Sequence, residues 1–230
     1  MKLLKKTNGV ILSFFCLTFI APKLFSQIPF RALENIANYS YDGKDFDEVV
    51  KYYRFYKPDS AAYYANIAIG IYNKQKDYQV LGNMFNHLGI INENQGAITE
   101  AEQKYKQAIS YFKSVNFQPG IADELNRLGV LQLRKSNYTT ATNFFLEALE
   151  IYDKLSLSSG IAECYLKLGA VHERQNDYDV ALNYIQKADS INTQLPFSVL
   201  TLSTYNALGS IYSKKICSQK LFVIMKMVLS

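Results

Sequence analysis

The sequence predicts an all-α protein, a right-handed superhelical solenoid built from antiparallel helix pairs with a 40-residue period. The first observation is a Leu-Gly pair that recurs at a constant interval of forty residues. The pairs are Leu88-Gly89, Leu128-Gly129, Leu168-Gly169 and Leu208-Gly209. The second observation is that alanine follows each of the first three glycines at twelve and at nineteen residues. These alanines are Ala101, Ala141 and Ala181, then Ala108, Ala148 and Ala188.

The recurring glycine predicts close packing between two helices in each unit. Glycine inside a helix is less favourable than alanine by roughly 1 kcal/mol, so its recurrence within an apolar helical pattern needs a packing reason. We expect a neighbouring helix to press against the backbone at these positions. In the central unit the pattern predicts a first helix over 121–134, a turn at Lys135-Ser136-Asn137 and a second helix over 138–154.

This order of residues resembles the tetratricopeptide repeat. The family pattern is a bulky residue, then Leu-Gly, then alanine, an aromatic residue and alanine. It is met by Phe85, Leu88, Gly89, Ala101, Tyr105 and Ala108; by Leu125, Leu128, Gly129, Ala141, Phe145 and Ala148; and by Tyr165, Leu168, Gly169, Ala181, Ile185 and Ala188. The family unit has about 34 residues. The resemblance to the longer repeats of kinesin light chain implies that the additional residues lengthen the second helix and its exit loop. It covers about residues 58–213.

The first 26 residues are typical of a secretory signal peptide. Three lysines (2, 5 and 6) precede an apolar stretch from Val10 to Ala21, and Ser26 stands before Gln27 at a plausible cleavage point. We expect cleavage near Ser26/Gln27 and a secreted or periplasmic protein. The apolar stretch is short for a bilayer span, so no stable membrane span is expected after cleavage. The alternative is a segment that stays attached as an anchor.

Between the signal peptide and the C-terminus, the sequence divides into an N-terminal cap and repeats. The predicted parts are a capping helix region at 27–57 with its helix at roughly 45–56, the second helix of a degenerate first repeat at 58–80, full repeats at 81–120, 121–160 and 161–200, and a partial, atypical last repeat at 201–230. In the last part, Leu221, Met225 and Val228 fall at the positions of a second helix. The sequence leaves open whether that helix forms.

Charge argues against a nucleic-acid partner. The signal segment holds four lysines and no acid, so the remaining chain has 25 − 4 = 21 basic against 20 acidic residues. No basic stripe with interleaved aromatic residues is left, so the pattern of a nucleic-acid binder is missing.

The sequence also predicts no enzyme. The chain has two histidines, and His172-Glu173 is followed by Asn176 where a zinc motif requires a second histidine. Glu93 and Glu173 lie two repeats apart, which is too far for an acid–base pair. We therefore expect no catalytic residues, no metal site and no cofactor.

The candidate binding residues are polar side chains of the first helices. Asn86, Asn126 and Asn206 share the position three before each glycine, and Leu166 interrupts the series. The resemblance implies that this position faces a concave groove. A carboxamide both donates and accepts hydrogen bonds, so such a ladder could bind the backbone of an extended peptide. The flanking candidates are Asn83, Asp123, Glu163, Arg134 and Arg174. The alternative is a solvated helix face without a ligand.

The expected function is a non-enzymatic, extracytoplasmic scaffold that binds a protein or peptide partner as the input module of a signalling system. The stretch Pro58-Asp59-Ser60-Ala61, followed by such repeats, resembles the exported sensor regions of Bacteroidetes-type histidine kinases. The alternative is a truncated fragment of such a two-component sensor kinase. The partner and the oligomeric state stay open.

Overall fold

The computed structural model describes the backbone of residues 43–194 and 199–229, and side chains between Phe46 and Cys217 outside 195–198. Residues 46–230 form one compact unit, which is described here. The predicted signal peptide lies outside the described residues. Within the described part the chain folds into nine α-helices and no strand. The helices are α4 (Gly43–Tyr53), α5 (Pro58–Gln75), α6 (Tyr78–Asn94), α7 (Ile98–Ser114), α8 (Gln118–Arg134), α9 (Tyr138–Lys154), α10 (Ser158–Arg174), α11 (Tyr178–Asn192) and α12 (Val199–Leu229).

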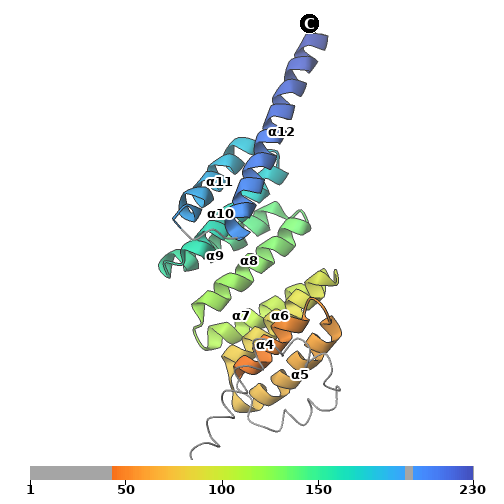
Figure 1. Cartoon of the computed structure of the whole chain (residues 1–230), viewed down its shortest axis with the longest axis vertical. Coiled ribbons are helices and arrows are strands. Elements are labelled where there is room, and N and C mark those ends of the chain that lie inside the picture. The colour runs from red at the N-terminus through yellow and green to blue at the C-terminus, as the bar shows by residue number, and fades with distance from the viewer. Residues whose placement is uncertain (1–42, 195–198, 230) are drawn as a thin grey trace, which may run out of the picture. The chain divides into compact units, whose positions relative to one another are not determined.

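The helices pack as consecutive pairs, so the predicted all-α solenoid of helix pairs is confirmed. The closest packing is between α6 and α7, α8 and α9, and α10 and α11, and Figure 1 shows these neighbours along the chain. We call α6, α8, α10 and α12 the A-helices, and α5, α7, α9 and α11 the B-helices. Each A-helix also packs against the B-helix that precedes it. This stacking makes the core continuous from one pair to the next.

The recurring glycines admit a large side chain of the B-helix, as the sequence predicted. A Cβ atom on Gly89 would lie 2.3 Å from Cε1 of Tyr105, and one on Gly129 would lie 2.5 Å from Cε1 of Phe145. Gly169 has the same relation to Ile185. The three glycines therefore permit a helix–helix distance that any other residue would obstruct.

Six connections between helices share one turn. A residue one or two positions after each helix end adopts a positive φ between 54° and 80°, at Lys76, Gly96, Asn116, Ser136, Ser156 and Asn176. At Ser136 the backbone N–H donates to Leu133 (3.1 Å), and the N–H of Asn137 donates to Gln132 (2.9 Å). This pair of bonds is the Schellman motif, which satisfies the last carbonyl groups of a helix. The turns recur every twenty residues, twice per repeat.

The equal spacing of the turns corrects one expectation. Helices α6 to α10 all have 17 residues, so the residues beyond the family's unit length do not lengthen the second helix alone. They are shared equally between A-helices and B-helices, because the same turn ends both. The predicted bounds of the second helix of the central unit, 138–154, are confirmed by α9.

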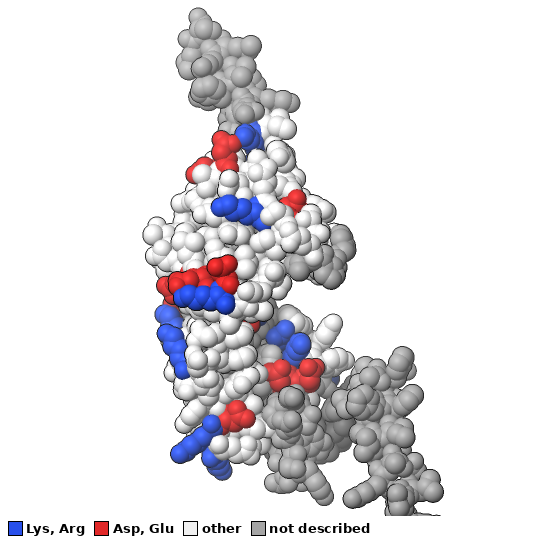
Figure 2. Space-filling model, turned by 90° about the vertical axis from the view of Figure 1, so that its left-hand side faces the viewer, with Lys and Arg blue, Asp and Glu red and all other residues white. Residues whose placement is uncertain are grey.

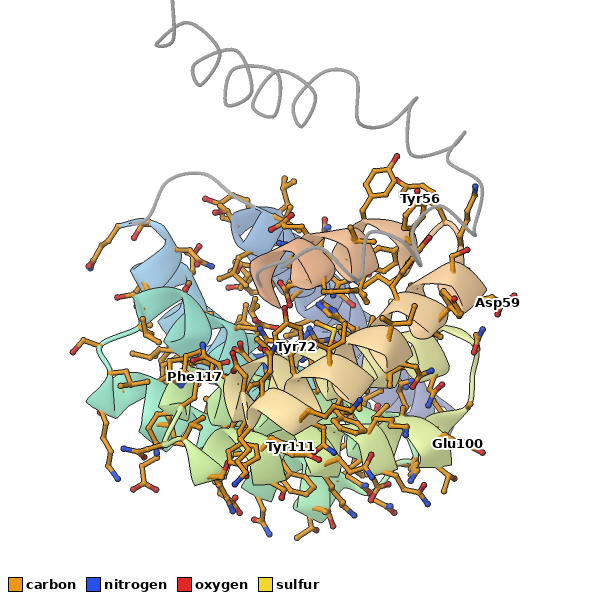
Figure 3. All side chains as sticks on the ribbon, turned by 90° about the horizontal axis from the view of Figure 1, so that it is seen from below. Tyr56, Asp59, Tyr72, Glu100, Tyr111 and Phe117 are labelled. Carbon is orange, nitrogen blue, oxygen red and sulfur yellow. The ribbon has the colours of Figure 1, made fainter. Side chains whose placement is uncertain are left out.

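Aromatic side chains of the B-helices form much of the core. Tyr105, Phe112, Phe145 and Tyr152 are all buried, as their helical spacing predicted. In Figure 3 Tyr72 of α5 lies between the ribbons, whereas the exposed Asp59 and Glu100 point away from them. The B-helices thus turn their aromatic stripe inward and their charged side chains toward solvent.

Helix α4 packs on α5 and on α6. The rings of Phe46 and Tyr72 lie 6.2 Å apart, and those of Tyr53 and Tyr64 lie 6.1 Å apart. Asp47 of α4 also reaches His87 of α6 (Oδ1 to Nε2, 3.0 Å). The predicted N-terminal helix at 45–56 is therefore present but ends earlier, at Tyr53.

The last unit is one uninterrupted helix. α12 runs from Val199 to Leu229 without the turn that ends the other A-helices. Ile216 stands forty residues after Asn176, at the turn position. A β-branched residue strongly disfavours positive φ, which explains why the helix continues. The separate second helix that the sequence left open is absent from the described backbone. Among the described residues, no helix is long and apolar enough to span a membrane.

The glycine contacts predict opposite effects for one substitution at two positions. Gly129→Ala should destabilise the chain by about 1–3 kcal/mol, because the new methyl group overlaps the ring of Phe145. Gly70→Ala on α5 meets no atom within 4 Å and should stabilise by roughly 0.5–1 kcal/mol through helix propensity. Urea unfolding of both variants measures the difference. Equal effects at the two positions would contradict the packing role of Gly129.

Candidate binding surface on the A-helices

All eight predicted groove residues lie on A-helices. Asn83 and Asn86 are on α6, Asp123, Asn126 and Arg134 on α8, Glu163 and Arg174 on α10, and Asn206 on α12. The structure thus places them on equivalent helices of successive pairs. Their assignment to a peptide groove stays a prediction, and their local surroundings differ.

The asparagine series is less exposed than expected. Asn86 donates a hydrogen bond from Nδ2 to the carboxylate of Glu124, across α6 and α8. Asn126 is buried, and its Oδ1 accepts no hydrogen bond from a described residue. The expectation of an exposed side chain is therefore wrong at Asn126, because repeat position alone does not tell how deeply adjacent helices enclose a residue. Asn206 is exposed.

Three of the charged candidates have partners within the chain. Arg134 contacts Glu93 of α6 (3.1 Å), Asp123 accepts a hydrogen bond from the hydroxyl group of Tyr152, and Glu163 lies 3.9 Å from Lys167. Burial, and then the hydrogen bond to Asp123, raise the pKa of Tyr152 well above its ordinary value. These three side chains therefore already form hydrogen bonds or ion pairs within the fold.

Ion pairs join some neighbouring A-helices at equivalent positions, and we call this series the A-helix seam. Glu93 of α6 pairs with Arg134 of α8, and Glu173 of α10 pairs with Lys214 of α12 (2.8 Å); each pair spans 41 residues. Leu133 takes the glutamate position between α8 and α10. Arg174, which is 41 residues after Leu133, consequently has no such partner.

Arg174 is therefore a cation that the seam leaves unpaired. It is exposed, and no ion pair or side-chain hydrogen bond among the described residues involves it. Asn83 and Asn206 likewise have no side-chain hydrogen bond among the described residues. Asn83 is half-buried and Asn206 is exposed. These three side chains retain their full capacity for an external ligand.

Sequence reasoning missed a partly buried polar cluster between α6 and the α4 region. Nδ1 of His87 lies 3.0 Å from the guanidinium group of Arg54, and Nε2 of His87 lies 3.0 Å from Asp47. Burial raises the pKa of Asp47, but the hydrogen bond and charge of His87 outweigh it and hold the pKa below its ordinary value. The sequence does contain a sign of this contact, because Asp47 and His87 lie forty residues apart, which is one repeat period.

Glu124 is the most deeply buried acid of this region. Its side chain is fully buried, and Oε2 has no hydrogen-bond partner among the described residues. Burial raises its pKa to about 7, against the lowering effects of the Asn86 hydrogen bond and the charge of Arg127. A carboxyl group in such a place is half-protonated near neutral pH.

Charges of both signs are mixed on the surface. Figure 2 shows acidic side chains beside basic ones on the face that it presents, without a large patch of one sign in the described part. No cluster of three or more His, Cys, Asp and Glu side chains suited to a metal ion occurs among the described residues. The described cysteines, Cys164 and Cys217, are free thiols.

Stacked helix pairs with glycine-seated side chains and polar A-helices define a helical repeat scaffold of the kind used for protein interaction. Within this scaffold, residues 120–192 match the model of the tetratricopeptide repeat family. These residues span two of the helix pairs, α8 with α9 and α10 with α11, except for the first two residues of α8. No curated protein sequence matches the chain.

Solved structures support the same fold over most of the chain. The apo form of RapI is 22% identical, with a TM-score of 0.65, and the match covers 87% of this chain and 81% of RapI. The TPR-like repeats of a putative kinesin light chain from Podospora anserina are 12% identical, with a TM-score of 0.61 and coverage of 80% and 92%.

A third similar structure belongs to a larger protein. The signal-transduction ATPase of Pyrococcus horikoshii that carries a tetratricopeptide repeat sensor is 15% identical, with a TM-score of 0.63. The match covers 84% of this chain and 29% of the ATPase. At these identities the likeness of all three structures concerns the fold alone.

The raised pKa of Glu124 predicts a pH dependence of stability that Glu124→Gln removes. The folded chain binds this proton more tightly than the unfolded chain, whose carboxyl group has a pKa near 4.5. The stabilising contribution is therefore complete below about pH 4.5 and is lost as the pH rises through about 7. The loss amounts to at most roughly 3–4 kcal/mol, since one pKa unit corresponds to ~1.4 kcal/mol.

Urea unfolding of both proteins across this pH range measures the effect. The difference in unfolding free energy, wild type minus Glu124→Gln, should fall as the pH rises, because other carboxyl groups contribute equally to both proteins. Glu147→Gln on the exposed side of α9 is the matched control. A difference that stays constant with pH would show that Glu124 is not the titrating group.

Proposed function

We propose that the chain is a non-enzymatic, extracytoplasmic scaffold that binds a protein or an extended peptide on its A-helices, as an input module of a signalling system. The observation that carries the proposal is the set of A-helix side chains for which the described residues offer no ion-pair or hydrogen-bond partner, namely Asn83, Arg174 and Asn206. The tetratricopeptide repeat match and the similar solved folds support a protein-interaction role.

The chemistry of these side chains suits the backbone of an extended peptide. Each carboxamide can donate to a carbonyl oxygen and accept from an N–H group at the same time. The guanidinium group of Arg174 offers donors in a planar fork, which suits a carboxylate or a pair of carbonyl groups. The half-buried Leu133 stands at the position from which an acid would have paired with Arg174. An extended segment with an acidic or carbonyl-rich stretch therefore fits this part of the surface.

The sensing role and the location rest on the sequence. The Pro58-Asp59-Ser60-Ala61 stretch and the basic-then-apolar N-terminus support export and a link to signalling. The tetratricopeptide repeats of the Pyrococcus horikoshii ATPase are described as a sensor, which supports such a use of the fold. The competing interpretation of the three polar side chains is a solvated helix face.

The peptide hypothesis predicts that the unpaired side chains control affinity. Peptides selected from a random library on the wild-type chain should bind the triple variant Asn83→Ala, Arg174→Ala, Asn206→Ala at least tenfold more weakly. Each lost hydrogen bond costs about 1 kcal/mol, and the loss at a charged group is larger. Fluorescence anisotropy with the selected peptides measures the dissociation constants.

The control exchanges two exposed asparagines of B-helices, Asn143 of α9 and Asn183 of α11, for alanine. It should bind the peptides as the wild type does, and both variants should keep the wild-type melting temperature. If the triple variant binds with unchanged affinity, the three side chains belong to a solvated face and the binding site lies elsewhere.

Export predicts a defined mature N-terminus. A bacterial host that expresses the full chain should release a protein beginning at Gln27 into its periplasm, because the basic segment and short apolar stretch direct export and cleavage. N-terminal sequencing of the periplasmic fraction provides the measurement. A chain that is recovered with Met1 still attached would contradict cleavage, and recovery from the cytoplasm would contradict export.

A further inference from the structure

Helix α12 has one face that packs into the repeat array. Leu200, Thr204, Leu208 and Ile211 lie on this face, and Ile211 and Thr204 are fully buried. The first half of α12 lies against α10 and α11 in Figure 1, as their packing requires. This face occupies the place that α6, α8 and α10 present to the preceding B-helix.

The opposite face is an apolar stripe that no described residue covers. It consists of Leu202, Tyr205, Gly209, Tyr212 and Ile216, and we call it the α12 stripe. Tyr205, Tyr212 and Ile216 are 51%, 47% and 51% exposed. The residues follow one another at intervals of three, four, three and four, which is the spacing of a two-stranded coiled-coil seam.

Gly209 lies on this face, at the position where the other A-helices contact a large side chain of the following B-helix. In the other A-helices the equivalent glycines 89, 129 and 169 each seat a large side chain, with hypothetical Cβ contacts of 2.3–2.5 Å. At Gly209 no atom lies within 4 Å of the same point. The α12 stripe therefore continues the series of A-helix faces that B-helices cover in the three preceding pairs, and its seat is free.

We propose that the α12 stripe binds the α12 stripe of a second copy of this chain, in antiparallel orientation. The stripe contains both parts of the contact, because Tyr205 and Tyr212 are large and Gly209 is the seat. When Tyr212 lies over Gly209 of the second copy, twofold symmetry places the second Tyr212 over the first Gly209. The same register sets Tyr205 opposite Ile216 (209 + 212 = 205 + 216), again twice. The stripe is self-complementary.

Charge permits this contact. The two described lysines of this helix lie outside the stripe, and each pairs within its own chain: Lys214 with Glu173 at 2.8 Å, and Lys215 with Asp179. Over the part of α12 with described side chains, two copies would therefore approach without bringing unpaired like charges together. The stripe itself contains no ionisable group other than the two tyrosine hydroxyls, which can stay hydrated at its edge.

The area of the stripe determines the strength to expect. Two half-exposed tyrosines with a leucine and an isoleucine offer on the order of 400–500 Å² per copy. Stable interfaces bury about 800 Å² per partner, so this contact should give a weak dimer with Kd on the order of tens of micromolar. Such a dimer joins two arrays through their α12 helices.

Sedimentation velocity of the purified chain over a range of concentrations tests the proposal. The wild type should shift from monomer to dimer as the concentration passes through tens of micromolar. Tyr212→Lys should raise Kd at least tenfold, and Leu146→Lys at an exposed apolar site of α9 should leave it unchanged. A wild type that stays monomeric at several hundred micromolar overturns the proposal. A dimer that is indifferent to Tyr212→Lys overturns it as well.

A mixing experiment tests the register. A Cβ atom on Gly209 meets no atom within 4 Å, and the face around it is exposed, so Gly209→Glu should not disturb the fold. Tyr212→Lys and Gly209→Glu chains should each be monomeric alone and should form a heterodimer when mixed, because the new opposite charges face each other and the second Tyr212–Gly209 contact is intact. Failure to form a heterodimer overturns the antiparallel register. Binding of wild-type α12 to a B-helix peptide, such as residues 138–154, without self-association would assign the stripe to a different helical partner.

Discussion

Direct contact between large side chains and glycine backbone is the constraint on which the other contacts of this fold depend. Each of the glycines 89, 129 and 169 fixes the distance between an A-helix and the B-helix that follows it. A second series of contacts fixes the distance to the preceding pair. The ring of Phe112 lies against Gly120 of the next A-helix, and Tyr152 lies against Gly160 in the same way. Because cores are close-packed, neither distance can relax to admit a side chain without displacing the ring.

The shared turn keeps these contacts in register. A Schellman turn ends A-helices and B-helices alike, and it recurs every twenty residues with a residue at positive φ. Because helices α6 to α10 have the same length and end in the same turn, each large side chain of a B-helix lies beside the glycine of its A-helix. The 40-residue sequence period is therefore the consequence of two 20-residue units with different roles, one that carries the glycine seat and one that carries the ring. The last of these turns among the described residues is at Asn176, and α12 continues through the position one repeat later, Ile216.

Most of the fold could be predicted from the sequence, because the contacts that define it recur. The bounds of α9 follow from the apolar spacing, and the packing role of Gly129 follows from its cost in a helix. The candidate binding surface could be predicted less well. Asn126 shares its repeat position with Asn206, yet one is buried and the other exposed, because burial depends on what the neighbouring helices place around each residue. The ion pair of Glu93 with Arg134 spans 41 residues, so it does not follow from the 40-residue period of the sequence.

Where the repeat pattern is broken, individual residues lack the contact that the pattern supplies in the other helix pairs. A contact that recurs in every pair uses both of its partners inside the fold, and a substitution in one pair releases the partner in the next. Leu133 takes the place of an acid, and Arg174 is left without an ion-pair partner among the described residues. Ile216 takes the place of a turn residue, and Gly209 keeps its seat open. In a scaffold whose interior is periodic, local inconsistency of this kind is expected at functional positions. Function therefore has to be sought where the period fails, at the surface between α8 and α10 and along α12.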